Sequence, residues 1–286
     1  MKKIINFDSM FEKLQISFIE KNYGKYSEQV LENKMVELYN KFGNKAFDEL
    51  GGLTPNEYYK TFTAVEKIKA LSQSIDCNIP VSDFLLEAII SDAFCEDLLV
   101  PMVRDKNDEK AIYAINVLAD FNSIKPLKSY IICVIERSVS DDVIESMIEQ
   151  LSLNADLVKD AILAAYPKYN EYQKAAFAPV LSYCKNKDDR ILPILLDELL
   201  IHPDDIAQYV EMVARYGDER ALDTLYKEIE REDIKYSDFV EIRFAIEKLG
   251  GEYTKERDFS NDEIFKKVRK QALEDRKKQA QMFGGK

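Results

Sequence analysis

The segment Leu50–Tyr59, which reads LGGLTPNEYY, is the stretch whose residue types could bind a phosphate. A Walker loop needs a first glycine, four further residues and then Gly-Lys-Ser/Thr, so that backbone N–H groups surround the phosphates and the lysine reaches the terminal one. No Gly-Lys pair follows Gly51 or Gly52. A dinucleotide-binding loop needs three spaced glycines after a buried strand, and the residues before Gly51 have no strand period. The segment therefore lacks both phosphate-binding patterns.

The same residues fit a junction between two helices. Gly51 can adopt the left-handed conformation that ends a helix. Thr54 suits the N-cap of the next helix, Pro55 suits its first position, and Glu57 completes a capping box. We therefore expect a helix–turn–helix junction here.

Cysteine and histidine are too few and too scattered to build a metal site. No C-x-x-C pair occurs among the four cysteines, Cys77, Cys95, Cys133 and Cys184. Three of them lie in apolar helical stretches, so we expect buried, reduced thiols. The one histidine, His202, follows a predicted helix, and we interpret it as a junction residue. The sequence thus predicts no catalytic residue, no cofactor and no metal site.

Pairs of acidic residues fall at the starts of predicted helices. They are Asp141-Asp142, Asp188-Asp189, Asp204-Asp205 and Asp218-Glu219. Carboxylates at such positions cap free N–H groups and lie at the positive end of the helix dipole. The alternative is an acidic, cation-binding edge, although calcium loops need alternating ligands and a glycine turn.

The net charge of −12 is distributed unevenly. Residues 264–286 carry eight Lys and Arg against two Asp and Glu, a net +6, so the first 263 residues sum to −18. An acidic body disfavours nucleic-acid binding, because that affinity comes mainly from neutralising phosphates. The chain has no apolar run long enough for a membrane span or a signal peptide. We expect a cytoplasmic protein that binds no membrane and no specific nucleic acid.

Apolar residues recur at helical spacing through nearly the whole chain, which predicts an all-α fold. From about residue 108 the helices form pairs. The apolar stripes of the first helices begin 33, 33, 29 and 33 residues apart, at Ala111, Ile144, Phe177, Ile206 and Phe239. Those of the second helices begin 14 to 16 residues later, at Leu127, Val158, Leu192 and Leu222. Stacked helix pairs can bury both faces where one pair cannot, so this period predicts a solenoid.

Two segments, VLSYCKNKDDRILPILLDELL and VARYGDERALDTLYKEIE, each combine a first helix, a short turn ending in Asp/Glu-Arg and a Leu-rich second helix. The pattern resembles the HEAT-repeat family of α-solenoids over about residues 81–249. The resemblance implies a right-handed superhelix of antiparallel helix pairs, in a family that serves mostly as protein-binding scaffolds and includes a few enzymes. Two departures are a pair at residues 140–166 without the arginine turn, and a fifth first helix without a clear partner after Gly250-Gly251.

The sequence divides into three expected regions. Residues 1–76 are helical without the 33-residue period and are expected to form an irregular cap. Residues 77–259 are expected to form the solenoid, and residues 260–286 a basic C-terminal helix.

The start of the C-terminal helix carries a second capping pattern. In FSNDEI, Ser260 as N-cap and Glu263 three residues later predict a capping box. The narrow apolar stripe of Ile264, Val268 and Ala272 fits a solvated helix that shields the last repeat. The alternative is a tail that binds an acidic partner or the acidic face of the protein itself.

A solenoid usually binds its partners along the groove lined by its second helices. Side chains of both signs are expected off the core face of these helices. They are Lys125, Lys128, Lys159, Asp160, Arg190, Asp197, Glu198, Lys227 and Glu228. Mixed signs suit a protein or peptide and not a polyanion.

Three tyrosines, Tyr166, Tyr169 and Tyr172, cluster about a predicted helix–helix turn. Tyrosine combines an apolar ring with a polar tip and is frequent at interfaces, so these residues are a second candidate contact. The alternative is that they pack the turn itself.

We interpret the chain as a non-enzymatic scaffold or adaptor that binds a protein or peptide and is monomeric or weakly oligomeric. One alternative is an enzyme on the same architecture, since HEAT-like DNA glycosylases act on nucleic acid. Such an enzyme needs a basic concave surface and stacking aromatic residues beside a carboxylate, which the −18 body disfavours. Another alternative is a regulator that uses its basic C-terminal tail.

Overall fold

The chain folds into helices throughout the part that the structure describes. The structure is a computed structural model that describes residues 3–283, and in this range it holds sixteen α-helices, five short 3-10 helices and no strand. Helices make up 72% of the structure, so the predicted all-α class is confirmed. None of the described helices is both long and apolar enough to cross a membrane.

Two compact units divide the chain, Met1–Met147 and Ile148–Lys286. The boundary falls inside α9 (Asp141–Leu153). Each unit has its own set of buried apolar side chains. The three regions expected from the sequence follow other boundaries and remain a prediction.

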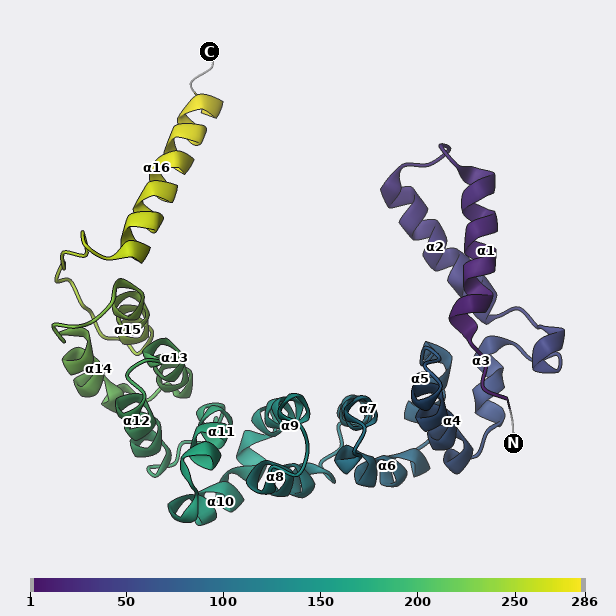
Figure 1. The fold of residues 1–286 in the computed structure, drawn as a ribbon, viewed down its shortest axis with the longest axis horizontal. Coiled ribbons are helices and arrows are strands. Elements are labelled where there is room, and N and C mark those ends of the chain that lie inside the picture. The colour runs from purple at the N-terminus through teal and green to yellow at the C-terminus, as the bar shows by residue number, and fades with distance from the viewer. Residues whose placement is uncertain (1–2, 284–286) are drawn as a thin grey trace. The chain divides into compact units, whose positions relative to one another are not determined.

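The first unit contains two long helices followed by shorter ones (Figure 1). Its α-helices before α9 are α1 (Phe7–Asn22), α2 (Glu28–Gly43), α3 (Pro55–Tyr58), α4 (Ala64–Asp76), α5 (Asp83–Ile90), α6 (Phe94–Leu99), α7 (Asp108–Asp120) and α8 (Leu127–Glu136). The 3-10 helices of this unit are η1 (Asp48–Leu50), η2 (Tyr59–Thr61) and η3 (Val100–Arg104).

An aromatic cluster packs the N-terminal helices of the first unit. Phe7 in α1 is buried, and its ring packs edge-on against Phe42, Tyr59 and Phe84 at centroid distances of 6.3, 5.8 and 5.2 Å. These four residues come from α1, α2, η2 and α5. Edge-on aromatic pairs add to the free energy of burial, so the cluster ties together segments that are far apart in the sequence.

The junction after α2 forms as the sequence predicts. Gly51 has a φ of 69° and ends η1 in the left-handed region. Pro55 is the first residue of α3, and the Thr54 backbone N–H donates to Glu57 Oε2 at 3.0 Å. The LGGLTP stretch therefore connects two short helices.

The second unit begins within α9 and contains the later helices. Its α-helices are α10 (Ala155–Ala165), α11 (Glu171–Ser182), α12 (Ile191–Ile201), α13 (Ile206–Tyr216), α14 (Leu222–Ile229), α15 (Tyr236–Lys248) and α16 (Glu263–Phe283). Its 3-10 helices are η4 (Tyr166–Lys168) and η5 (Glu219–Ala221).

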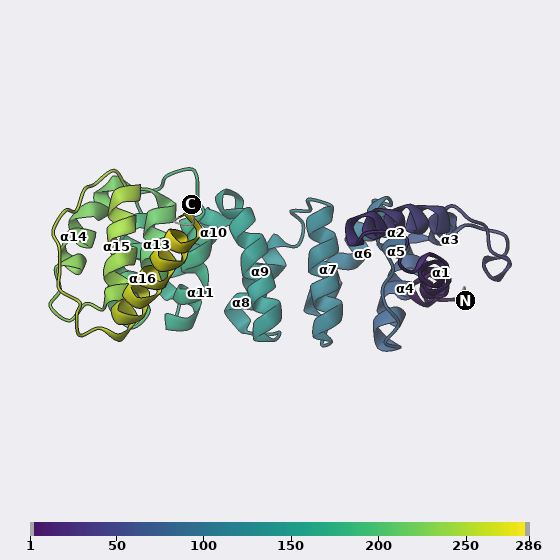
Figure 2. The same cartoon turned by 90° about the horizontal axis from the view of Figure 1, so that it is seen from above.

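The helices of the second unit form two rows. The first helices α11, α13 and α15 lie side by side, since α13 contacts both of the others, and Figure 2 shows α13 and α15 running next to each other. The second helices lie on one side of this row: α12 packs against α11 and α13, and α14 packs against α15 (Figure 1).

The predicted cap of the C-terminal helix is wrong by two residues. Asp262 caps α16, because its Oδ1 accepts the backbone N–H groups of Ile264 at 2.8 Å and Phe265 at 3.0 Å. The Asp262 carboxylate also accepts the backbone N–H of Tyr236 at 3.1 Å. Ser260 instead donates its backbone N–H to Asp258. A contact with the start of α15 therefore selects Asp262 over Ser260 as the N-cap.

Candidate functional site: the aspartate–arginine turns of the second unit

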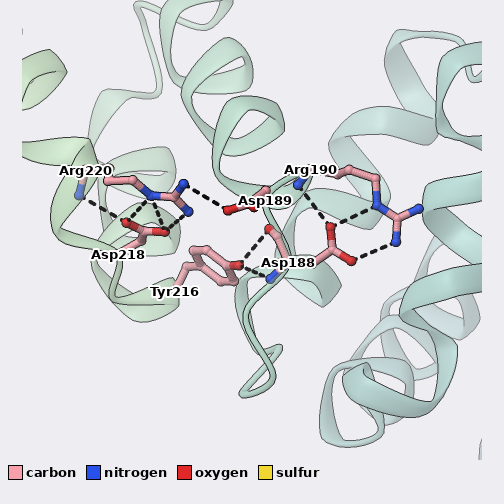
Figure 3. Close-up of polar contacts among 6 residues, drawn as sticks. All are labelled: Asp188, Asp189, Arg190, Tyr216, Asp218 and Arg220. Carbon is pink, nitrogen blue, oxygen red and sulfur yellow. Dashed lines mark hydrogen bonds and ion pairs between the residues drawn. The ribbon is translucent and has the colours of Figure 1, made fainter.

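Two turns in the second unit carry the same constellation 30 residues apart. Each places an aspartate two residues before an arginine, immediately before a second helix: Asp188 and Arg190 precede α12, and Asp218 and Arg220 precede α14. Figure 3 draws both turns, with each arginine folded back onto the aspartate of its own turn. We call these two turns, together with Tyr216, the turn ladder.

In the first turn, Asp188 takes three hydrogen bonds from Arg190. The backbone N–H and the Nε of Arg190 donate to Asp188 Oδ1 at 3.0 and 2.9 Å, and Nη2 donates to Oδ2 at 2.7 Å. Nη2 also reaches Asp160 Oδ1 in α10 at 3.3 Å. The arginine thus links its own turn to the preceding second helix.

The second turn repeats this arrangement. Arg220 donates its backbone N–H and its Nε to Asp218 Oδ1, both at 3.0 Å, and its Nη2 to Oδ2 at 2.6 Å. Its Nη1 lies 2.9 Å from Asp189 Oδ1 in the turn before (Figure 3). Each arginine therefore pairs with an aspartate of the preceding helix pair.

Tyr216, the last residue of α13, joins the two turns through the backbone. Its hydroxyl accepts the Asp188 N–H at 2.9 Å and donates to the Asp188 carbonyl oxygen at 3.0 Å (Figure 3). The Lys187 ammonium lies over the Tyr216 ring, 4.0 Å from its centroid. Since Tyr216 is buried and uses its hydroxyl both as acceptor and as donor, it fixes the distance between neighbouring helix pairs.

The ladder holds its carboxylates in the charged form. The side-chain hydrogen bonds from Arg190 lower the pKa of Asp188 far below its ordinary value of 3.8. Those from Arg220 likewise lower the pKa of Asp218. Both carboxylates therefore act as hydrogen-bond acceptors at neutral pH, which is the opposite of what a general acid needs.

The predicted partner-binding side chains fall into separate groups. Arg190 and Lys159 lie at the same turn, near Asp188. Lys159 Nζ donates to the Asn186 carbonyl oxygen at 3.3 Å. Asp197 on α12 and Lys227 on α14 are exposed. Lys128 is exposed on α8 of the first unit.

Two of the three candidate tyrosines lie in the interior. Tyr166 and Tyr169 are 8% and 9% exposed, and the Tyr169 ring stacks on Phe177 at 5.2 Å. Tyr172 is half-buried near the start of α11. The rings of Tyr166 and Tyr169 therefore pack the α10–α11 turn.

The Tyr166 hydroxyl leads to a buried carboxylate. It donates to Glu198 Oε1 at 3.0 Å, and Glu198 in α12 is only 2% exposed. Glu198 Oε2 lies 3.4 Å from His202 Nε2, but the two atoms do not form a hydrogen bond with each other. Neither of these buried atoms has another hydrogen-bond partner among the described residues. The His202 ring stacks on Tyr209 at 4.7 Å. Burial and the nearby Glu198 raise the pKa of Tyr166, so its hydroxyl stays a donor.

Sequence reasoning missed Tyr216. Its placement of Glu198 off the core face is wrong, because the side chain of Glu198 is buried in α12. The KNKDDR and YGDER segments signal the turns themselves, because an acid two residues before an arginine can bind it locally. Tyr216 contacts a turn 28 residues earlier, and Glu198 contacts a tyrosine 32 residues earlier. A signal for Glu198 is present in LLDELL, where its position two turns after Ile191 falls on the buried stripe of α12.

Three of the four cysteines are buried, namely Cys95, Cys133 and Cys184, and Cys77 is exposed. Burial raises the pKa of Cys95 and of Cys184 to about 11, so both remain thiols at neutral pH. Among the described residues, no group of three or more His, Cys, Asp or Glu side chains is placed to hold a metal ion.

An open hollow of about 310 Å³ lies beside the α9–α10 turn. Leu153, Leu157 and Tyr183 line it and are 71%, 65% and 45% exposed. The Arg215 guanidinium lies over the Tyr183 ring, 4.3 Å from its centroid. Ser152, Asn154, Asp156 and Lys185 supply the polar part of the lining. The Asp156 carboxylate already accepts the backbone N–H groups of Lys185 and Asn186.

Comparison with protein families, with characterised proteins and with solved structures found no match to this chain.

Proposed function

We propose that the chain is a non-enzymatic scaffold that binds a protein or peptide, and that its second unit is a short HEAT-like α-solenoid. Three features support this architecture. First and second helices alternate, the first helices pack as one row, and the turn before the second helix recurs with the same Asp–Arg bonds 30 residues apart. Repeats that contact mainly their neighbours are typical of solenoids.

The proposed partner lies along the second helices α10, α12 and α14. One observation carries this proposal: Asp197 on α12 and Lys227 on α14 are exposed on successive second helices and have opposite signs. Asp160 on α10 and Arg190 at the start of α12 are also exposed and opposite in sign. A surface that alternates in sign attracts a partner of matching pattern and repels a polyanion in part. The expected complex is therefore with a protein or peptide.

The same features offer little to an enzyme that acts on nucleic acid. Such a site needs a reactive carboxylate in a basic groove. The carboxylates of Asp188 and Asp218 are hydrogen-bonded to arginine. Glu198 is buried in an acidic region and not in a basic groove. Asp197 adds to the raised pKa of Tyr166, and Asp205 adds to that of Tyr209. The scaffold proposal is therefore preferred.

Cross-linking of complexes captured from source-cell extract tests the proposed face. A lysine-reactive reagent and mass spectrometry would map which lysines lie near the bound protein. We expect links from Lys159 and Lys227 on the second helices. Matched controls are Lys174 in α11 and Lys248 in α15, on the first-helix row. Links confined to these controls or to α16 would contradict the proposed face.

A further inference from the structure

A buried carboxylate and a histidine lie together where α12 ends and α13 follows. Glu198 is 2% exposed, and His202, the C-cap residue of α12, has a side chain that is 30% exposed. Glu198 Oε2 lies 3.4 Å from His202 Nε2, and both atoms are without a hydrogen bond in the described part of the chain. Buried polar atoms of this kind are rare in folded proteins, so this pair calls for an explanation.

Neighbouring contacts hold the two groups in place. The His202 ring stacks on Tyr209 of α13 with an interplanar angle of 7°, and the His202 carbonyl oxygen accepts the Asp205 backbone N–H at 3.1 Å. The other carboxylate oxygen, Glu198 Oε1, already accepts the Tyr166 hydroxyl at 3.0 Å. Oε2 and Nε2 are therefore the two atoms of this group that still need a bond.

One proton between these atoms satisfies both of them. If neither atom carries a proton, each presents a lone pair to the other, and two acceptors at 3.4 Å repel. An imidazolium donates from both ring nitrogens, and its bond to a carboxylate is charge-assisted and stronger than a bond from a neutral ring. A shift of a few tenths of an ångström by the partly exposed ring brings the two atoms within hydrogen-bond distance.

The charged groups around the pair favour a cation at His202. The titratable groups that face it from the packed elements are Tyr166 in η4, Lys174 in α11, Asp197 in α12, Asp205 at the N-cap of α13 and Tyr209 in α13. Burial, followed by the charge of Glu198, raises the pKa of both tyrosines, so both stay neutral. The Lys174 ammonium lies over the Tyr166 ring, 5.8 Å from its centroid. Three carboxylates thus outnumber this ammonium.

We propose that Glu198 and His202 form a pH-sensitive switch at the α12–α13 junction, in which His202 takes up a proton and its imidazolium binds the buried Glu198 carboxylate. The folded chain stabilises the protonated ring through this bond, whereas water solvates both groups in the unfolded chain. The contribution to stability is therefore fully present below about pH 6.5, where a free histidine is protonated. It is lost as the pH rises through the point at which the folded chain releases the proton. The switch lies inside the second unit, so it goes beyond the scaffold proposal and does not depend on it.

Nuclear magnetic resonance of the full chain tests the switch at a single residue, because His202 is its one histidine. The ring signals are followed from about pH 5 to about pH 9 in the parent chain and in Glu198→Gln, which keeps the size of the side chain and removes its charge. We expect the titration midpoint of the ring to fall by at least about one pH unit in the variant, since a close opposite charge is lost.

Asp197→Asn is the matched control, because it removes an exposed carboxylate one residue from Glu198. It should move the titration midpoint of the ring much less. A midpoint that Glu198→Gln leaves unchanged overturns the proposal, and so does an equal change in Asp197→Asn, which would assign the effect to the acidic region as a whole.

Urea unfolding of the parent chain and of His202→Gln gives a second readout that does not require the Glu198 variant to fold. The unfolding equilibrium constant of the parent should fall about tenfold between about pH 8.5 and about pH 6.5, because the folded chain there binds more protons than the unfolded chain. His202→Gln should remove this pH dependence. A parent chain that is equally stable at both pH values, or a dependence that persists unchanged in His202→Gln, contradicts the switch.

Discussion

At the scale of single residues, Tyr166 is the only side chain seen to donate a hydrogen bond to the nearly inaccessible carboxylate of Glu198, within the described part of the chain. A buried carboxylate without donors is unfavourable, because it has lost water without replacement. The hydroxyl at 3.0 Å offsets part of that cost. Tyr166 is therefore a stability determinant of the second unit, and this role explains why a tyrosine lies at a buried turn.

Tyr166→Phe should destabilise the second unit by about 1–3 kcal/mol, because it leaves a buried acceptor without its donor. Urea unfolding followed by circular dichroism measures the change. Tyr183→Phe is the control. Because Tyr183 is 45% exposed, water can take the place of its hydroxyl group. Equal stability of the Tyr166 variant and the parent chain would show that Glu198 is satisfied in another way.

Asp218 carries a pH dependence whose sign follows from its contacts. The side-chain bonds from Arg220 lower its pKa in the folded state below the ordinary 3.8, so folding favours the carboxylate. Its contribution to stability is fully present above about pH 3.8 and is lost as the pH falls through the folded-state pKa. Acid therefore weakens the Asp218–Arg220 contact.

Asp218→Asn should lower the urea midpoint at pH 7. The difference from the parent chain should shrink as the pH falls from about 3.8 toward the lowered folded-state pKa of Asp218, because protonation removes the charge that Arg220 stabilises. Asp223→Asn, on the exposed face of α14, is the matched control and should change the midpoint little at any pH. A difference that grows on acidification would have the wrong sign for the proposed role of Arg220.

At the scale of elements, the connection after α15 depends on close packing around Gly251. A Cβ there would lie 2.7 Å from the Tyr226 hydroxyl, 2.8 Å from Ile246 Cγ2 and 2.8 Å from Leu222 Cδ2. The Tyr226 hydroxyl cannot easily move, since it accepts the Glu252 N–H at 3.1 Å and donates to its carbonyl oxygen at 3.2 Å. The chain passes close to α14 and α15 here because residue 251 has no side chain.

Gly251→Ala should therefore cost about 1–3 kcal/mol through overpacking. The comparison is Gly24→Ala, where φ is 72° and no atom lies within 4 Å of the added Cβ, so the cost is backbone strain of about 1–2 kcal/mol without a clash. Unfolding curves of both variants, and a crystal structure of the Gly251 variant, give the measurement. A Gly251 variant as stable as the parent would mean that α14 and α15 can separate freely.

Elements were predictable from the sequence where their signals are local. Thr54, Pro55 and Glu57 define the start of α3 within four residues, and the structure agrees. The start of α16 was not predictable in this way, because Ser260 and Asp262 compete as caps. A tertiary bond from Tyr236 decides in favour of Asp262. Phe265, which anchors α16, was also missed because it lies off the stripe of Ile264 and Val268.

At the scale of the whole molecule, composition and periodicity predicted the helical class, and the two compact units were not expected. The unit boundary lies within α9, a helix whose apolar stripe begins at Ile144 like that of any other repeat. Helical periodicity shows which face of a helix is buried. It does not show whether the residues on that face pack against the preceding helices or the following ones. For the site, the sequence indicated the acid–arginine turns, but the links through Tyr216 and Asp160 depend on residues about one repeat away.

The proposed class of partner, a protein or peptide, rests on the charge pattern of the chain. The body of −18 opposes a polyanion, while the exposed charges of both signs on the second helices fit a protein surface. Asp197 and Lys227 are suitable for a direct test, because both are exposed and neither takes part in the Asp–Arg bonds of the two turns.

Quantitative affinity capture from nuclease-treated source-cell extract tests the scaffold proposal most directly, with the intact chain compared with the Asp197→Lys/Lys227→Glu variant. The scaffold proposal predicts that the intact chain retains a defined protein in stoichiometric amount. It also predicts that the variant, with the same circular dichroism spectrum, retains at least about tenfold less, as expected when complementary charges become like charges. Equal capture by both chains, or capture that nuclease treatment abolishes, would contradict it.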